Sequence, residues 1–122
     1  MTETYSILFV DDEPALRMLV QDQLMTEKHA VDTADDGDTA LEALKKKTYD
    51  VILLDMRMPR VSGIEVLKQI RERKIKSRVI VLTAVDDLSV AIEAVKNGAN
   101  DYLTKPYDLK SLTTAIQRVM AK

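Results

Sequence analysis

The stretch Val51-Ile52-Leu53-Leu54-Asp55 places four apolar side chains in a row directly before an acid. An unbroken apolar run of this length is typical of a strand that is covered on both faces of a parallel sheet. Two similar runs occur, at Tyr5 to Val10, which Asp11 and Asp12 follow, and at Val79 to Leu82. The sequence therefore predicts at least three central strands, two of which end at acids.

Segments with helical spacing of apolar residues separate these strands, and His29 to Ala34 and Tyr102 to Thr104 read as two further strands. The helical positions are Leu16, Leu19, Val20 and Leu24; Ala40, Leu41 and Leu44; Ile64, Leu67 and Ile70; Leu88, Ala91, Ile92 and Val95; and Leu109, Leu112, Ile116 and Val119. Five alternations of strand and helix predict an α/β fold, a doubly wound parallel sheet with helices on both faces.

Length and composition fit one soluble domain over residues 1–122, since 46% of the chain is hydrophobic and 31% is charged. No cysteine is present, which excludes a disulfide scaffold, a zinc-thiolate site and an iron-sulfur cluster. The lone histidine, His29, argues against an imidazole metal site, and we expect it at the surface. No apolar run approaches the roughly 20 residues of a membrane span, and no signal peptide is visible, so we expect a cytoplasmic protein without membrane contact.

The net charge of −2 hides an uneven distribution of charge along the chain. Residues 1–40 hold ten acids and two bases, whereas residues 41–122 hold ten acids and sixteen bases. The acidic end is therefore where a cation site is expected. The basic run from Arg71 to Arg78 lacks aromatic neighbours and reads as a solvated face, so no direct contact with nucleic acid is expected.

Polar residues follow four of the predicted strands: Asp11 and Asp12, Asp55, Thr83, and Lys105. In parallel sheets ligands bind beyond the carboxyl ends of the strands, so we expect these side chains to share one pocket. Three close carboxylates repel one another, and a small hard cation such as Mg²⁺ removes that repulsion. Asp55 could then attack an activated phosphoryl group, with Lys105 gripping one phosphoryl oxygen and Thr83 another, to form an aspartyl phosphate.

Each of these residues also has a plain structural interpretation. The acids before Pro14 could cap a helix, Thr83 could be an ordinary β-branched strand residue, and Lys105 could be an exposed lysine. Tyr102 would ordinarily be half-buried packing. The methionines, among them Met18, Met25 and Met120, read as core filler. It is the joint occurrence of the acids and the lysine at strand ends that favours a site.

With these residues assembled, the chain from Ile7 to about Met120 resembles the receiver domain of bacterial two-component response regulators. The matching motifs are Phe9-Val10-Asp11-Asp12-Glu13, Leu54-Asp55-Met56-Arg57-Met58-Pro59 with Gly63, Val81-Leu82-Thr83-Ala84 and Asp101-Tyr102-Leu103-Thr104-Lys105-Pro106. The resemblance implies a flavodoxin-like, CheY-like sheet with strand order 2-1-3-4-5, and Asp55 as the phosphoacceptor. It implies a magnesium site from Asp11, Asp12, Asp55 and the backbone carbonyl of Arg57, with Thr83 and Tyr102 as switch residues. It also implies a cis peptide bond between Lys105 and Pro106.

The function that the resemblance implies is that of a phosphorylation-controlled signalling module rather than an enzyme with a separate substrate. Its phosphodonor would be a histidine kinase or a phosphotransfer protein, and it would catalyse only its own phosphorylation and dephosphorylation. Phosphorylation would alter the surface of the fourth helix, fifth strand and fifth helix, which would bind a second copy or an effector. Whether an effector domain follows Lys122 in the native gene is left open.

Two other function classes share this architecture. Haloacid-dehalogenase phosphatases also use an aspartate after a strand, but they need a second acid two residues later, where this chain has Arg57. A flavin mononucleotide binder would need a hydroxyl-rich phosphate loop after the first strand, where Asp11, Asp12 and Glu13 would repel phosphate. Both alternatives are therefore weaker than the signalling module.

The side chains at Arg57 and Val85 bear on how long a phosphoryl group would persist. They stand two residues after Asp55 and Thr83, and neither can act as a base toward water. We expect slow self-dephosphorylation, with Arg57 shielding the phosphoryl oxygens. The opposite hypothesis is that Arg57 stabilises the hydrolytic transition state and speeds the loss.

Overall fold

The computed structural model of the protein describes residues 3–58, 60–84 and 86–121. Five parallel strands form one sheet in the order β2-β1-β3-β4-β5, as predicted. The strands are β1 (Ser6–Val10), β2 (Ala30–Ala34), β3 (Val51–Asp55), β4 (Arg78–Ala84) and β5 (Asp101–Lys105). The helices are α1 (Pro14–Thr26), α2 (Gly37–Lys46), α3 (Gly63–Glu72), α4 (Leu88–Lys96) and α5 (Leu109–Met120).

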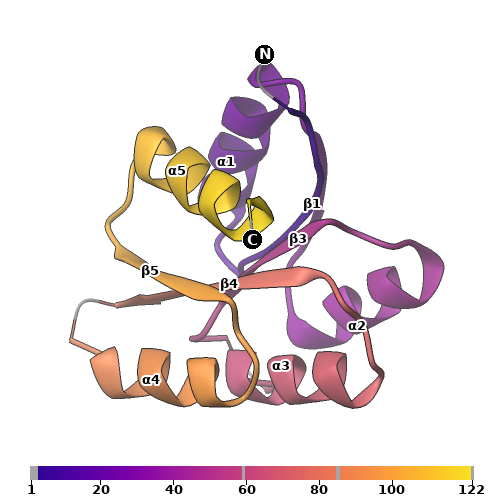
Figure 1. The fold of residues 1–122 in the computed structure, drawn as a ribbon, viewed down its shortest axis with the longest axis vertical. Coiled ribbons are helices and arrows are strands. Elements are labelled where there is room, and N and C mark those ends of the chain that lie inside the picture. The colour runs from indigo at the N-terminus through magenta and orange to yellow at the C-terminus, as the bar shows by residue number, and fades with distance from the viewer. Residues whose placement is uncertain (1–2, 59, 85, 122) are drawn as a thin grey trace.

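Helices cover both faces of the sheet, because alternate strand side chains point to opposite sides. α1 and α5 lie on one face, and α2, α3 and α4 lie on the other (Figure 1). Ile7 and Phe9 of β1 belong to the core that α1 and α5 cover, while Leu8 and Val10 belong to the opposite core. The apolar run of β3 is fully buried, as predicted for a central strand.

Arg71 fixes the amino-terminal edge of the sheet. Its Nε donates to the Gly98 carbonyl at 3.0 Å, one Nη donates to the carbonyls of Ile75 and Ser77 at 2.7 and 3.0 Å, and the other donates to Asn100 Oδ1 at 3.0 Å. Gly98 has φ of +104°, and a Cβ there would lie 2.9 Å from Arg71 Cγ. Within the basic run, Arg71 is thus a structural residue and not part of a merely solvated face.

The prediction that His29 lies at the surface is wrong. His29 is only 6% exposed, and its Nδ1 accepts a hydrogen bond from the backbone amide of Tyr5 at 3.0 Å. The imidazole and the Tyr5 ring are stacked with their centroids 5.8 Å apart. Burial lowers the pKa of His29, while the charge of Glu27 opposes that shift. His29 therefore serves as a neutral acceptor between the starts of β1 and β2.

Two other expectations about burial are also corrected. Met18 and Met25 are 67% and 53% exposed on α1 and are not core filler. The apolar stripe of α4 is exposed at its large residues, which are Leu88, Ile92 and Val95. α4 packs on the sheet through Ala91 and Ala94 instead, because small side chains let the helix approach closely. Among the described residues, no helix is long and apolar enough to cross a membrane.

Candidate functional site

The carboxyl ends of the central strands bring the predicted site residues to one edge of the sheet. Asp11 directly follows β1, Asp55 is the last residue of β3, and Lys105 is the last residue of β5. Asp55 pairs in register with Leu82 of β4, so Thr83 lies one residue further along the neighbouring strand. The strand order therefore determines which polar residues meet.

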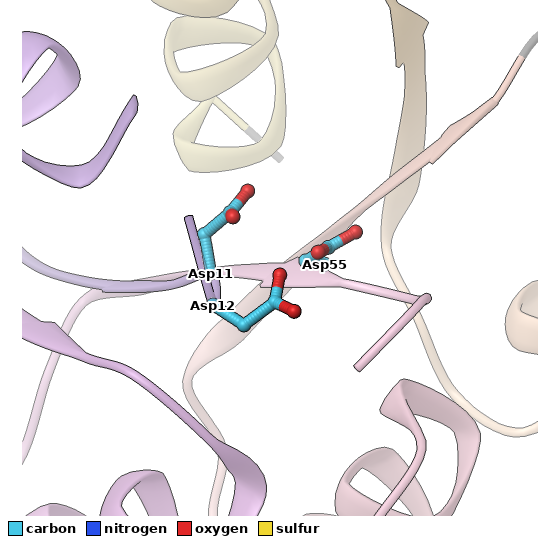
Figure 2. A group of neighbouring side chains, drawn as sticks. All are labelled: Asp11, Asp12 and Asp55. Atoms are coloured by element: carbon cyan, nitrogen blue, oxygen red, sulfur yellow. The ribbon is translucent and has the colours of Figure 1, made fainter. Parts of the chain in front are cut away.

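Three carboxylates form a cluster at this edge. Ligand oxygens of Asp11, Asp12 and Asp55 all lie within 4.8 Å of one another. Figure 2 shows the three carboxyl groups gathered beside the ends of β1 and β3. Asp11 and Asp55 are 1% and 3% exposed, whereas Asp12 is exposed. Two buried acids and one solvent-facing acid therefore line a site that is open on one side.

Lys105 supplies the positive charge of the site. Its Nζ lies 3.3 Å from Asp55 Oδ1, to which it donates, and 3.5 Å from Asp11 Oδ2. Burial disfavours the charge on Lys105, but the two carboxylates outweigh it and raise the pKa of the ammonium group. Lys105 is therefore held as a cation beside Asp55.

Asp55 remains under electrostatic strain despite the lysine. Burial raises the pKa of its carboxyl group, the charge of Asp11 adds to that shift, and Lys105 opposes it without cancelling it. Asp11 Oδ2 has no hydrogen-bond partner among the described residues, although it is buried. One lysine therefore leaves the acid cluster undercompensated. An oxygen-only donor set with a buried carboxylate oxygen that makes only a 3.5 Å ion pair with Lys105 among the described residues fits a hard divalent cation such as Mg²⁺.

Backbone contacts hold the two buried acids in place. Glu13 N donates to Asp11 Oδ1 at 2.9 Å, and Arg57 N donates to Asp55 Oδ1 at 3.3 Å. Gly63, at the start of α3, allows the chain to pass close to the end of β3. A Cβ on Gly63 would lie 2.6 Å from the carbonyl oxygen of Asp55, so only glycine fits there without a shift of the backbone.

Thr83 and Tyr102 lie on the α4 side of the sheet edge. Thr83 is 1% exposed, and its hydroxyl has no hydrogen-bond partner within the described part of the chain. Tyr102 pairs in register with Val81 of β4, and it is 40% exposed. A buried hydroxyl without a partner is rare in folded proteins, so Thr83 is free to bond to a group that enters the site.

The side chain of Arg57 does not lie over Asp55. Its Nε donates to Asp87 Oδ2 at 2.6 Å, and its Nη2 makes an ion pair with the same oxygen. The position where a phosphatase would need a second acid therefore holds an arginine that is already paired. Sequence reasoning missed Asp87, because nothing in a local pattern connects two residues 30 positions apart. Val85, the other residue expected to affect phosphoryl lifetime, lies outside the described residues.

Sequence reasoning also missed Tyr107, two residues beyond Lys105. Its buried hydroxyl has no partner among the described residues. Burial raises its pKa, and the charges of Asp11 and Asp55 add to the shift. The peptide bond between Lys105 and Pro106 is cis, as the resemblance implied. The segment after β5 therefore carries a further buried hydroxyl, and its pKa responds to the charges of both acids.

Comparisons with known proteins agree on one family. The family model for the response regulator receiver domain matches residues 7–117. The chain is 37% identical over 120 residues to the regulatory protein AtoC of Escherichia coli, covering 98% of this chain and 26% of that protein. It is 36% identical over 121 residues to the transcriptional regulatory protein ResD of Bacillus subtilis, covering 99% of this chain and 50% of that protein.

A solved structure gives the same result. The chemotaxis protein CheY4 of Vibrio cholerae superposes with a TM-score of 0.89 and 31% identity, covering 96% of this chain and 99% of that one. The curated relatives AtoC and ResD are longer, and the chain spans half of their length or less. The chain is therefore similar both to a protein of about its own length and to parts of longer proteins.

Proposed function

The chain belongs to the receiver domains of two-component response regulators, and on that premise we propose that Asp55 accepts a phosphoryl group from a histidine kinase or a phosphotransfer protein. One observation carries this assignment: of the three clustered acids, only Asp55 ends a central strand and accepts a hydrogen bond from Lys105, at 3.3 Å. Asp55 is 3% exposed and lies beside the exposed Asp12, on the side from which we expect a donor to approach.

The transfer follows from the positions of the side chains. A carboxylate oxygen of Asp55 attacks phosphorus in line, a new O–P bond forms, and the P–N bond of the donor phosphohistidine breaks. The electron pair of that bond leaves with the imidazole, which departs neutral because its second nitrogen already carries a proton. Lys105 stabilises the negative charge on the phosphoryl oxygens, and the free hydroxyl of Thr83 donates to one of them.

The acid cluster is proposed to hold Mg²⁺ through Asp11, Asp12 and Asp55, with the backbone carbonyl of Arg57 as a fourth ligand. When bound there, Mg²⁺ supplies positive charge that offsets the repulsion between the carboxylates and the phosphoryl oxygens. The chain's own contribution is to keep two acids buried and undercompensated until a cation arrives. In this proposal the chain catalyses only its own phosphorylation and dephosphorylation.

We propose that the phosphoryl group acts on the surface through Thr83. When the hydroxyl turns toward the phosphoryl oxygens, it leaves space into which the ring of Tyr102 can move. The exposed apolar side chains Leu88, Ile92 and Val95 of α4 lie on the face that would change. A shift from 1:99 to 99:1 would need about 5.5 kcal/mol of differential interaction, so a partial shift is expected. The responding partner is a second copy or an effector.

Acetyl phosphate with Mg²⁺ tests the phosphoacceptor. The parent is expected to gain the mass of one phosphoryl group, and a chelator added beforehand prevents the gain. Asp55→Asn removes the nucleophilic carboxylate and is expected to stay unmodified. Asp50→Asn is the matched control, because Asp50 lies at the other edge of the sheet, where its carboxylate accepts from Ser6 N at 2.9 Å. Undiminished labelling of Asp55→Asn would overturn the assignment.

A further inference from the structure

Three helices of the fold begin with a side chain that caps the first turn. Asp36 accepts from Thr39 N at 2.8 Å before α2, and Asp108 accepts from Ser111 N at 2.8 Å before α5. Ser62 does the same for α3 through its hydroxyl. In each case the bond runs from the cap to the amide three residues later, as is usual for an N-cap.

α4 begins differently, although an aspartate also stands at its N-cap. Asp87 makes no side-chain cap bond, and its ψ of 39° departs from the extended backbone of the three capping residues. The amide of Val90, which a capping Asp87 would bind, donates instead to the backbone carbonyl of Asp87 at 3.0 Å. The first turn of α4 contains no acid that could take over. α4 shares the lack of a side-chain cap and of an acid in the first turn with α1, which has Pro14 at its start instead.

One oxygen of the Asp87 carboxylate, Oδ2, is engaged by Arg57. The guanidinium approaches Asp87 Oδ2 through Nε at 2.6 Å and through Nη2. Asp87 is only 21% exposed at its side chain, whereas the side chain of Arg57 is 65% exposed. The arginine is thus the more exposed partner, and we expect it to move when the pair opens while the aspartate stays near the helix.

Arg57 is also within reach of the phosphoacceptor. Its backbone amide donates to Asp55 Oδ1 at 3.3 Å, so its side chain is rooted at the edge of the acid site. A phosphoryl group carries more negative charge than a carboxylate, and its oxygens accept a planar guanidinium at two points. A phosphoryl group on Asp55 would therefore attract the same guanidinium that Asp87 now holds.

We propose that Asp87 is a positioning residue for Arg57. Asp87 and a phosphoryl group on Asp55 compete for the guanidinium of Arg57. When the phosphoryl group binds the guanidinium, the released carboxylate of Asp87 caps α4. This rests on the proposed function, since it needs a phosphoryl group on Asp55. The guanidinium shields the phosphoryl oxygens when it moves onto them. Release of Asp87 changes the backbone at the start of α4, which links the site to the exposed face of that helix by a route separate from Thr83.

A four-protein comparison of phosphoryl half-life tests the competition. The proteins are the parent, Asp87→Ala, Arg57→Gln and the double variant, each loaded with acetyl phosphate and Mg²⁺. Asp87→Ala frees the guanidinium, so its half-life is expected to exceed that of the parent at least about threefold. In the Arg57→Gln background the same substitution is expected to change nothing. Asp86→Ala is the matched control, because Asp86 is an exposed acid in the same loop.

A spectroscopic signature tests the capping step. Beryllofluoride with Mg²⁺ stands in for the phosphoryl group, and the amide of Val90 is followed by NMR and hydrogen exchange. The parent is expected to show a shifted and more protected Val90 amide, and Asp87→Ala is expected to show neither change. An equal half-life effect of Asp87→Ala with and without Arg57, or an unchanged or shorter half-life, overturns the competition. A parent that takes up no phosphoryl group overturns the proposed function as well.

Discussion

At the amino-terminal edge of the sheet Arg71 and Ser77 are paired, although the buried hydroxyl of Ser6 is not, whereas at the carboxyl-terminal edge several buried polar atoms make no hydrogen bond within the described part of the chain. Arg71 uses its guanidinium on four acceptors, and Ser77 Oγ donates to the carbonyl of Tyr49 at 2.5 Å. At the other edge, the hydroxyls of Thr83 and Tyr107 have no hydrogen-bond partner within the described residues, and Asp11 Oδ2 has only an ion pair with Lys105 at 3.5 Å. The polar residues at the first edge thus stabilise the fold, whereas polar atoms at the second edge are available to hydrogen-bond to a ligand.

The difference separates structural polar residues from functional ones. A buried polar group that is fully bonded contributes to stability, and its loss leaves its partners unsatisfied. A buried polar group without a partner contributes little to stability and is available to a ligand. Substitutions at the two edges should therefore have opposite profiles: loss of stability at the amino-terminal edge and loss of phosphorylation at the carboxyl-terminal edge.

The largest expected effect comes from Asp11→Asn. We expect the rate of phosphorylation by acetyl phosphate to fall by roughly 100-fold or more, because a proposed metal ligand loses its charge. The free energy of unfolding should stay within about 1 kcal/mol of the parent, since lost attraction to Lys105 is offset by lost repulsion from Asp55. Phosphate-transfer kinetics and urea denaturation measure the two quantities. Asp50→Asn, the same chemical change at the other edge, should leave the rate of phosphorylation unchanged, and a large loss of stability in Asp11→Asn would break the comparison.

Arg71→Met should show the opposite profile. The substitution keeps an unbranched apolar stem but removes the donors to Gly98, Ile75, Ser77 and Asn100, so the free energy of unfolding should fall by about 2 kcal/mol. Phosphorylation at Asp55 should be unchanged at a temperature where the variant is folded. Urea denaturation provides the measurement. The control Arg73→Met should shift stability by less than about 0.5 kcal/mol, because Arg73 is exposed. Equal stabilities of the two variants would contradict the role of Arg71.

A smaller and sharper contrast compares two buried hydroxyls. Ser77→Ala removes a bonded hydroxyl and should lower the free energy of unfolding by about 1 kcal/mol, with signalling intact. Thr83→Val removes an unpaired hydroxyl at nearly constant shape, and its stability should match or exceed that of the parent. Thr83→Val should still be phosphorylated, but the change in the NMR signals of the Tyr102 ring should disappear. A Tyr102 response that survives in Thr83→Val would show that the two residues are not coupled.

Much of this contrast could be predicted from the sequence, because strand ends are visible as the points where apolar runs stop. The run before Asp55 located the central strand, and the topology of a doubly wound sheet then determined that Asp11, Thr83 and Lys105 share an edge. The Arg57–Asp87 pair could not be predicted, because it depends on how two loops meet. The exposed face of α4 was also hidden, since helical spacing places Ala91 in one stripe with Leu88, Ile92 and Val95 but does not show that the helix packs through Ala91 and Ala94.

His29 was missed for a different reason: a single histidine in a sequence carries no periodicity. In the structure its Nδ1 accepts from Tyr5 N, a bond that exists only while the ring is neutral. Burial lowers the pKa of His29 below its ordinary value of 6.5. The unfolded chain therefore binds a proton at a higher pH than the folded chain does. Stability from this group is complete above pH 6.5 and is lost as the pH falls below it, with a slope of at most about 1.4 kcal/mol per pH unit.

Urea denaturation of the parent and His29→Asn between pH 8 and pH 5.5 checks this smallest effect. Asparagine keeps an acceptor oxygen near the position of Nδ1 but does not titrate, so the difference in unfolding free energy between the two proteins isolates the proton bound by residue 29. We expect that difference to be constant above pH 7 and to move in favour of His29→Asn as the pH falls. Because the acids at the other edge of the sheet titrate in both proteins, they cancel. A difference that stays constant down to pH 5.5 would mean that the protonated ring keeps its place, and the amino-terminal edge would then be insensitive to pH.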